Sequence, residues 1–193
     1  MTGESKILAV LGLCGVGKSE VARIIKAQYG YSIVYFGGQI TKEVARRGLL
    51  SGPENEREVR EQLRADYGMD AVARLAKGEI ADILAAGERV VIDGVYSQAA
   101  IEYIKATLPE SISTLAVHSR KSHRYKRMER RPVRPLTPGQ LDERDIREIA
   151  ALDKATPIAL ADFHLVNDGT IDELEAGVRR ALECLDPSIR QGG

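Results

Sequence analysis

A glycine-rich motif near the N-terminus restricts this chain to a small set of folds. Residues 12–19 read Gly-Leu-Cys-Gly-Val-Gly-Lys-Ser and fit the pattern G-x-x-x-x-G-K-[ST]. A short apolar run, residues 6–11, precedes the motif, and helical spacing of Val21, Ala22 and Ile25 follows it. A strand, a glycine loop and a helix in this order form a nest of backbone N–H groups at a helix N-terminus, which binds phosphate. The motif therefore predicts a nucleotide-binding protein.

The last two residues of the motif carry its charge and its metal-binding group. Lys18 would reach the β- and γ-phosphates, and the Ser19 hydroxyl would be a ligand of Mg²⁺. We therefore expect ATP and Mg²⁺ as cofactors. The residues expected to hold the nucleotide are Gly12, Leu13, Cys14, Gly15, Val16, Gly17, Lys18, Ser19 and Glu20.

Length and composition agree with one domain spanning residues 1–193. Of the 193 residues, 44% are hydrophobic and 29% charged, and the formal net charge is zero. Because no global field attracts the chain to nucleic acid or to a membrane, we expect neither as a partner. The N-terminus is polar, the apolar run after it has only six residues, and we expect a cytoplasmic protein. The two cysteines have no metal-ligand spacing.

Strand-like and helix-like segments alternate along the chain. Further strands are expected at residues 32–36, 90–93, 112–118 and 162–167, each followed by a helical segment. Helical sequence fills residues 41–50 and 54–86, interrupted at 51–53 and at Gly68. This alternation predicts an α/β fold, a three-layer α/β/α P-loop NTPase with a five-stranded parallel sheet. A helical acceptor region is expected at about residues 38–86 and a lid at about 120–150.

An acidic residue ends the third expected strand. Asp93 precedes Gly94 and would project into the crevice at the carboxyl edge of the sheet. A carboxylate there can hold Mg²⁺ or bind the acceptor, so Asp93 is expected to be catalytic and to share the metal with Ser19. The alternative is an aspartate that caps a helix or a turn.

The densest basic cluster follows the fourth strand. Arg120, Arg124, Arg127 and Arg131 are spaced i, i+4, i+7 and i+11, so they would share one face of a helix. Like charges on one stripe repel unless an anion lies across them, and guanidinium groups on a mobile lid stabilise a transferring phosphoryl group. For phosphoryl transfer, that anion is the polyphosphate of the nucleotide. A solvated basic face or an RNA-binding stripe is the alternative.

In the order of these segments the chain resembles the nucleoside-monophosphate-kinase branch of the P-loop kinases. It is most similar to a little-characterised group related to dephospho-CoA kinases and adenylate or cytidylate kinases. The similar pieces are residues 12–19, 43–48, 91–94, 124–131, 143–145, 161–162 and 166–170. The resemblance implies that Arg124 lies against adenine and that residues 167–169, with Asn167 and Gly169 at their ends, border the base. It also implies that Arg127 and Arg131 lie near the phosphates, so we expect both to be catalytic.

The chain departs from these relatives on the acceptor side. Gly38 and Thr41 stand where relatives have an Asp and an Arg, and Tyr96 stands in place of another Arg. Two arginines that would bind an acceptor phosphate are therefore replaced. The residues expected to bind the acceptor are Gly38, Gln39, Thr41, Arg46 and Tyr96.

These observations indicate an ATP-dependent kinase with a small nucleotide-like acceptor. A nucleoside monophosphate is favoured on resemblance, with Arg46, Arg47 and Arg57 near enough in sequence to replace the lost arginines. A hydroxyl acceptor, as in a dephospho-CoA or nucleoside kinase, would instead use Asp93 as a base. A noncatalytic nucleotide switch also fits the lost arginines. The chain lacks the Asn-Lys-x-Asp element of GTPase switches, and its length argues against motors and AAA-type ATPases. The sequence leaves the oligomeric state open.

Overall fold

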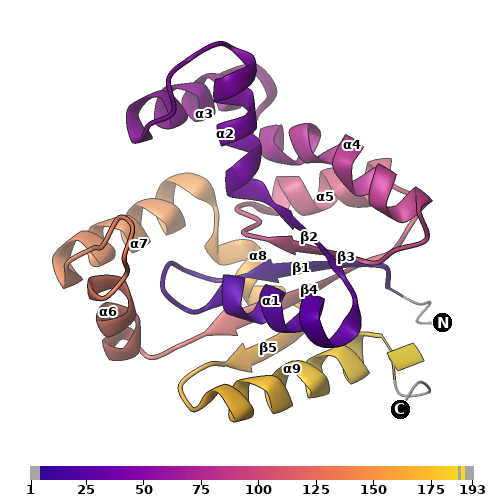
Figure 1. The fold of residues 1–193 in the computed structure, drawn as a ribbon. Coiled ribbons are helices and arrows are strands. Elements are labelled where there is room, and N and C mark those ends of the chain that lie inside the picture. The colour runs from indigo at the N-terminus through magenta and orange to yellow at the C-terminus, as the bar shows by residue number, and fades with distance from the viewer. Residues whose placement is uncertain (1–4, 187, 190–193) are drawn as a thin grey trace.

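Five parallel strands form the central sheet of the computed structural model, which describes residues 5–186 and 188–189 (Figure 1). The strand order is β2-β3-β1-β4-β5. The strands are β1 (Ile7–Leu11), β2 (Ser32–Tyr35), β3 (Val90–Asp93), β4 (Ile112–His118) and β5 (Phe163–Val166). The predicted α/β class and five-stranded parallel sheet are confirmed. The predicted domain limits, residues 1 and 193, lie outside the described residues.

Helices cover both faces of this sheet. They are α1 (Lys18–Tyr29), α2 (Phe36–Arg46), α3 (Pro53–Tyr67), α4 (Ala71–Ala85), α5 (Gln98–Thr107), α6 (Lys121–Glu129), α7 (Pro138–Leu152), α8 (Ala155–Ala159) and α9 (Ile171–Leu185). Along the described part of the chain, no helix is long and apolar enough to cross a membrane.

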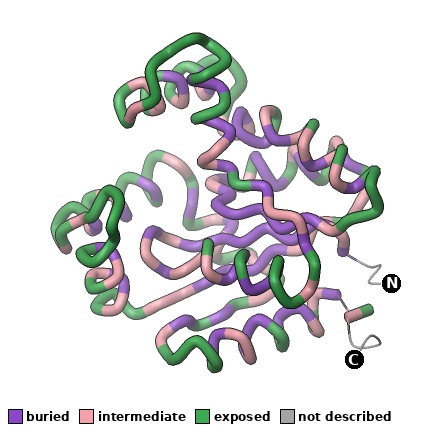
Figure 2. The backbone as a smooth tube through the Cα atoms, viewed as in Figure 1, coloured by how far each residue is buried: buried purple, intermediate pink, exposed green. Residues whose placement is uncertain are grey.

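The two faces of β1 pack into two separate hydrophobic clusters. Ile7 and Ala9 lie with residues of α4 and α5, whereas Leu8 and Val10 lie with residues of α1 and α9. Every residue of β1 is buried, as expected of a parallel strand covered on both faces (Figure 2). This packing fixes the carboxyl edge of the sheet, where the glycine loop leaves β1.

The start of α2 differs from the sequence prediction. A helix was expected from Thr41, but α2 begins at Phe36, directly after β2. Phe36, Ile40 and Val44 are spaced four residues apart and are buried on one face of the helix. The ring of Tyr35 lies where a side chain at Gly37 would be, so glycine is required there for packing. Burial of this apolar stripe outweighs the low helix propensity of two glycines.

The predicted four-arginine helix face is wrong. Helix α6 spans only Lys121–Glu129, so Arg120 caps its start and Arg131 lies beyond its end. Pro132 explains the termination, since the residue before a proline is disfavoured in helical conformation. The arginines therefore point to different partners rather than along one stripe.

Helix α9 begins with a reciprocal cap that should be measurable in stability. The Thr170 hydroxyl accepts from the Glu173 backbone N–H at 3.3 Å, and the Glu173 carboxylate accepts from the Thr170 N–H at 2.7 Å. Thr170→Ala removes the first bond and is expected to lower the free energy of unfolding by about 1 kcal/mol in urea titrations. Thr41→Ala, on the exposed face of α2, is the control and should change it by less than about 0.5 kcal/mol. Equal effects of the two variants would contradict the role of the cap.

Candidate active site

The glycine loop between β1 and α1 forms the floor of the candidate site. Gly12, Gly15 and Gly17 have φ values of 140°, 82° and 98°, which L side chains rarely adopt. A Cβ at Gly12 would lie 2.5 Å from the Val117 carbonyl oxygen, and one at Gly17 would overlap the Asn167 amide. Glycine is therefore favoured at these positions because the backbone has a positive φ and because there is little room for a side chain.

Lys18 and Ser19 lie at the start of α1, with Asp93 beside them. The Lys18 Nζ donates to the Leu13 carbonyl oxygen at 3.0 Å. Burial, and then the positive charge of Lys154, lower the pKa of Lys18 to about 8. The Ser19 hydroxyl donates to the Asp93 carboxylate at 2.6 Å. Asp93 reaches this position because β3 pairs with β1, with Asp93 opposite Val10.

The Ser19 and Asp93 oxygens are suitable for Mg²⁺. Magnesium prefers oxygen ligands and is commonly bound through one or two protein groups together with phosphate and water. Among the described residues there is no cluster of three or more His, Cys, Asp or Glu side chains that could hold a metal. The pair therefore fits a metal ion that would arrive with the phosphates of a nucleotide.

A cleft of about 330 Å³ lies above this loop. The predicted site residues that line it are Cys14, Gly15, Gly17, Lys18, Ser19, Glu20, Asp93, Tyr96, Arg127 and Arg131. The lining also includes residues to which the sequence analysis gave no role: Tyr35, Gly94, Met128, Arg144 and Lys154. Residues from the glycine loop, α1, β3, α6 and α7 thus meet in one space.

Lys154 is the functional candidate that the sequence reasoning missed. It is only 2% exposed, and its Nζ donates to the Glu148 carboxylate at 2.7 Å. Arg144 donates to the other Glu148 oxygen at 2.9 Å. Burial acts to raise the pKa of Glu148, but Lys154 and then Arg144 outweigh it and bring that pKa to about 2. Burial also raises the pKa of Tyr96 to about 12, so its phenol stays neutral.

Two arginines of α6 are held next to the glycine loop. Arg124 is buried, donating to the Cys14 carbonyl oxygen at 2.7 Å and to Asp145 at 2.6 Å. Arg127 donates to the Asn167 carbonyl oxygen at 2.8 Å. Asn167 in turn donates from its side chain to the Val16 carbonyl oxygen at 2.8 Å. No local pattern of residues predicts these hydrogen bonds to the carbonyl groups of the loop.

Several residues expected on the acceptor side lie elsewhere. Gly38, Gln39 and Thr41 are within α2 and line neither the cleft nor the arginine-rich cavity described below. Gln39 donates to Glu79 at 2.8 Å. The exposed Arg46 pairs with Glu43 at 2.6 Å. Of that predicted group, the structure brings only Tyr96 to the cleft.

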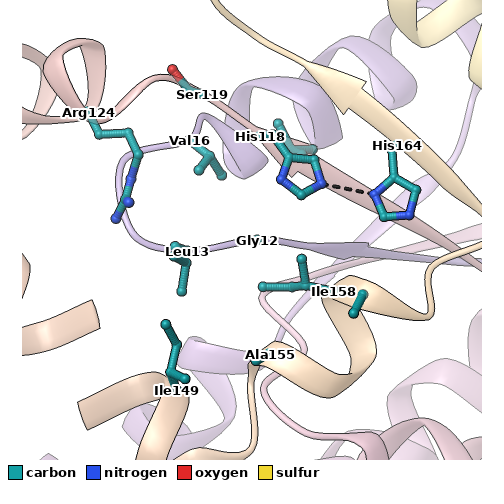
Figure 3. A pocket seen from close by; sticks show the side chains of 12 residues that line it. Gly12, Leu13, Val16, His118, Ser119, Arg124, Ile149, Ala155, Ile158 and His164 are labelled. Carbon is teal, nitrogen blue, oxygen red and sulfur yellow. Dashed lines mark hydrogen bonds between the residues drawn. The ribbon is translucent and has the colours of Figure 1, made fainter. Parts of the chain in front are cut away.

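Other residues predicted to bind the nucleotide border a second, mostly apolar cavity of about 320 Å³ (Figure 3). Its lining includes Gly12, Leu13, Val16 and Arg124 and shares no residue with the cleft. His118 and His164 face each other at its rim, with ring nitrogens 3.0 Å apart. Residues of the glycine loop thus line both the cleft and this apolar cavity. Gly169 lines a third cavity, near the start of α9.

A cationic cavity of about 350 Å³ adjoins the cleft between α3 and α7. Tyr96 and Arg144 line both spaces. Its other arginines are Arg57, Arg60, Arg64, Arg134 and Arg147. Arginines that the sequence analysis did not assign to an acceptor site, apart from Arg57, therefore gather in this cavity.

The buried Glu148 pair should make stability depend on pH. Its folded pKa, about 2, lies below the ordinary 4.5, so its stabilisation is present above pH 4.5 and is lost as pH falls towards 2. Glu148→Gln leaves Lys154 buried without its carboxylate and is expected to cost roughly 3 kcal/mol at pH 7. In chemical unfolding experiments, the free energy of unfolding of the variant should also depend less on pH between pH 5 and pH 2 than that of the wild type. Glu102→Gln, at an exposed pair, is the control; a wild-type profile for Glu148→Gln would refute this role.

The chain is similar in sequence to known proteins over most of its length. A family model described as an AAA domain matches residues 8–147. A UPF0200 protein of Thermococcus sibiricus is 33% identical over 182 residues, covering 93% of this chain and 95% of that protein. A UPF0200 protein of Aeropyrum pernix is 35% identical over 176 residues, or 91% of each.

Solved structures share the fold. TT1252 from Thermus thermophilus has a TM-score of 0.63 at 20% identity, covering 91% of this chain and 95% of that chain. A shikimate kinase from Bacteroides thetaiotaomicron has a TM-score of 0.58 at 16% identity, covering 93% and 97%. At such identities the likeness establishes the fold alone, and that fold is the kinase-like P-loop fold that the resemblance implied. From the chain length, we did not expect an AAA-type ATPase. The match to the family model described as an AAA domain shows that chain length does not exclude this family. The chain therefore belongs to the UPF0200 proteins and, over residues 8–147, to the AAA-domain family.

Proposed function

We propose that this protein is an ATP-dependent phosphotransferase whose acceptor is the phosphate of a small nucleotide-like molecule. The observation that carries the proposal is the charge distribution in the cleft. Lys18 and the Ser19–Asp93 pair lie on the loop side, whereas Arg131, Arg144 and Lys154 supply positive charge to the same space. Such a cleft suits two phosphate groups brought together for transfer.

The loop side suits the donor. The backbone N–H groups and Lys18 would hold the β- and γ-phosphates of ATP, while Ser19 and Asp93 would hold Mg²⁺. The metal would neutralise charge that develops between these phosphates. Arg131, exposed beyond the end of α6, is free to reach the transferred group.

The acceptor side favours a phosphate oxygen over a hydroxyl. A hydroxyl needs a base within hydrogen-bond reach, and the carboxylates lining the cleft are Glu20 and Asp93. Glu20 pairs with Arg23, and Asp93 already accepts from Ser19. An ionised phosphate oxygen needs no base: it bonds to the γ-phosphorus as the bond to the β–γ bridging oxygen breaks, and ADP leaves with that electron pair.

Loss of Lys18 tests the donor site. Lys18→Ala should lower kcat/KM by roughly 100-fold or more, because a preorganised charge on the transferring phosphoryl contributes about 3 kcal/mol. Lys26→Ala, on the exposed side of the same helix, should stay within about threefold of wild type. Coupled measurement of ADP release gives both values. If kcat/KM of Lys18→Ala stayed within threefold of wild type, the assignment of Lys18 to the ATP-binding site would be wrong.

The acceptor class is tested by a panel assayed for ATP-dependent phosphorylation. Nucleoside monophosphates should react, while nucleosides and dephospho-CoA should not. Asp93→Asn should then act chiefly through Mg²⁺, so that raising the Mg²⁺ concentration restores much of the rate. A hydroxyl acceptor would instead lose roughly 10²-fold in kcat at every Mg²⁺ concentration. ATP binding without turnover of any acceptor would favour a nucleotide switch.

A further inference from the structure

Helix α3 presents a row of arginines to the cationic cavity. Arg57, Arg60 and Arg64 follow the i, i+3, i+7 spacing that places side chains on one helix face, and all three line the cavity. Arg147 of α7 lines the same space. Among the described residues, none of these four arginines has an ion pair within 4.0 Å.

The acidic residues of the cavity leave this charge largely unbalanced. Of its three glutamates, Glu56 pairs with Arg134 at 3.1 Å. Glu148 is shared between Arg144 and Lys154, which leaves Glu61 as the third. Six arginines therefore face three carboxylates, two of which are already paired.

Gathering these guanidinium groups has an electrostatic cost. Burial, and then the neighbouring charge of Arg60, lower the pKa of Arg64. A multiply charged anion relieves such repulsion and can accept bidentate hydrogen bonds from several arginines at once. The cavity, about 350 Å³ in volume, is large enough for a phosphate group and part of the molecule that carries it.

The position of the cavity connects it to phosphoryl transfer. Tyr96 and Arg144 line both the cavity and the cleft, so one ligand can extend from Asp93 to α3. Lys18 and Ser19 line only the cleft. An anion in the cavity is therefore separate from the two phosphates between which transfer takes place.

We propose that the cavity between α3 and α7 binds a second anionic group of the acceptor, a phosphate remote from the phosphate that accepts the phosphoryl group. The substrate class is thus a small molecule with two separated phosphates. This inference rests on the proposed function for the identity of the ligand. The anion site itself can be tested without turnover.

The binding experiment uses inorganic pyrophosphate as probe and calorimetry as readout. The full chain is first saturated with Mg²⁺ and a nonhydrolysable ATP analogue, so that the glycine loop is occupied. Pyrophosphate should then bind, and Arg60→Gln combined with Arg64→Gln should weaken this binding at least tenfold. Arg147→Gln, on the exposed surface of α7, should weaken it severalfold and guards against a folding defect in α3. Arg179→Gln, exposed on α9, removes the same charge outside the cavity and should leave the affinity unchanged.

The kinetic experiment compares a nucleoside 5′-monophosphate with its 3′,5′-bisphosphate. The bisphosphate should have at least a tenfold lower KM. The α3 double variant should abolish this advantage, and Arg179→Gln should retain it. Equal KM values for the two acceptors, or equal pyrophosphate affinity in the double variant and Arg179→Gln, would overturn the inference. If no acceptor reacts but pyrophosphate binding still depends on Arg60 and Arg64, the anion site stands and the proposed function fails.

Discussion

The candidate site depends on how the carbonyl groups of the glycine loop are held. Lys18 donates to the Leu13 carbonyl oxygen, Arg124 to that of Cys14, and Asn167 to that of Val16. Arg127 approaches the Gly15 and Val16 oxygens at 3.4 Å, and α1 uses the Gly17 carbonyl in its first turn. Because these acceptors are satisfied by neighbouring donors, the loop is preorganised with its amides available for an anion.

This arrangement gives the basic segment after β4 a structural role. Arg124 and Arg127 bind the loop from α6, and Asp145 of α7 neutralises Arg124 in a buried pair. A buried arginine that lost this partner would carry an uncompensated charge, so the two helices and the loop are coupled. Arg131 lies beyond the fixed part and keeps its exposure. Arg124 and Arg127 are thus held by hydrogen bonds at the glycine loop, whereas Arg131 is exposed.

Positive charge in the cleft and the adjoining cavity has a different origin from the one that the sequence suggested. Arg46 and Arg47, near the replaced positions, are both held by Glu43 in α2. The charge comes instead from α3, from α7 and from Lys154, which follows α7. Tyr96, which occupies the position of a lost arginine, lies between these groups, with the Lys154 ammonium 5.4 Å from its ring. Positive charge is therefore present in both spaces although neither Thr41 nor Tyr96 is an arginine.

The sequence by itself determined the sheet, the phosphate loop and the residues nearest to it. Local order and spacing decide these features: a buried strand followed by glycines and a helix places Lys18 and Ser19, and the end of a strand places Asp93. The sequence did not predict that α2 begins at Phe36, because burial of the Phe36 side chain favours a helix there despite the two glycines that follow. Nor did it predict that α6 ends at Glu129, because the disfavoured helical conformation before Pro132 outweighs the helical spacing of the arginines.

Only the tertiary structure decided which charges meet. Lys154 and Glu148 are six residues apart and Tyr96 is far from both in sequence, yet they share one buried cluster. The arginines of α3 and α7 are about 80 residues apart and carry no spacing signal that relates one group to the other. Coulombic interactions depend on distance in space and on burial, and neither quantity is encoded in a local pattern of residues.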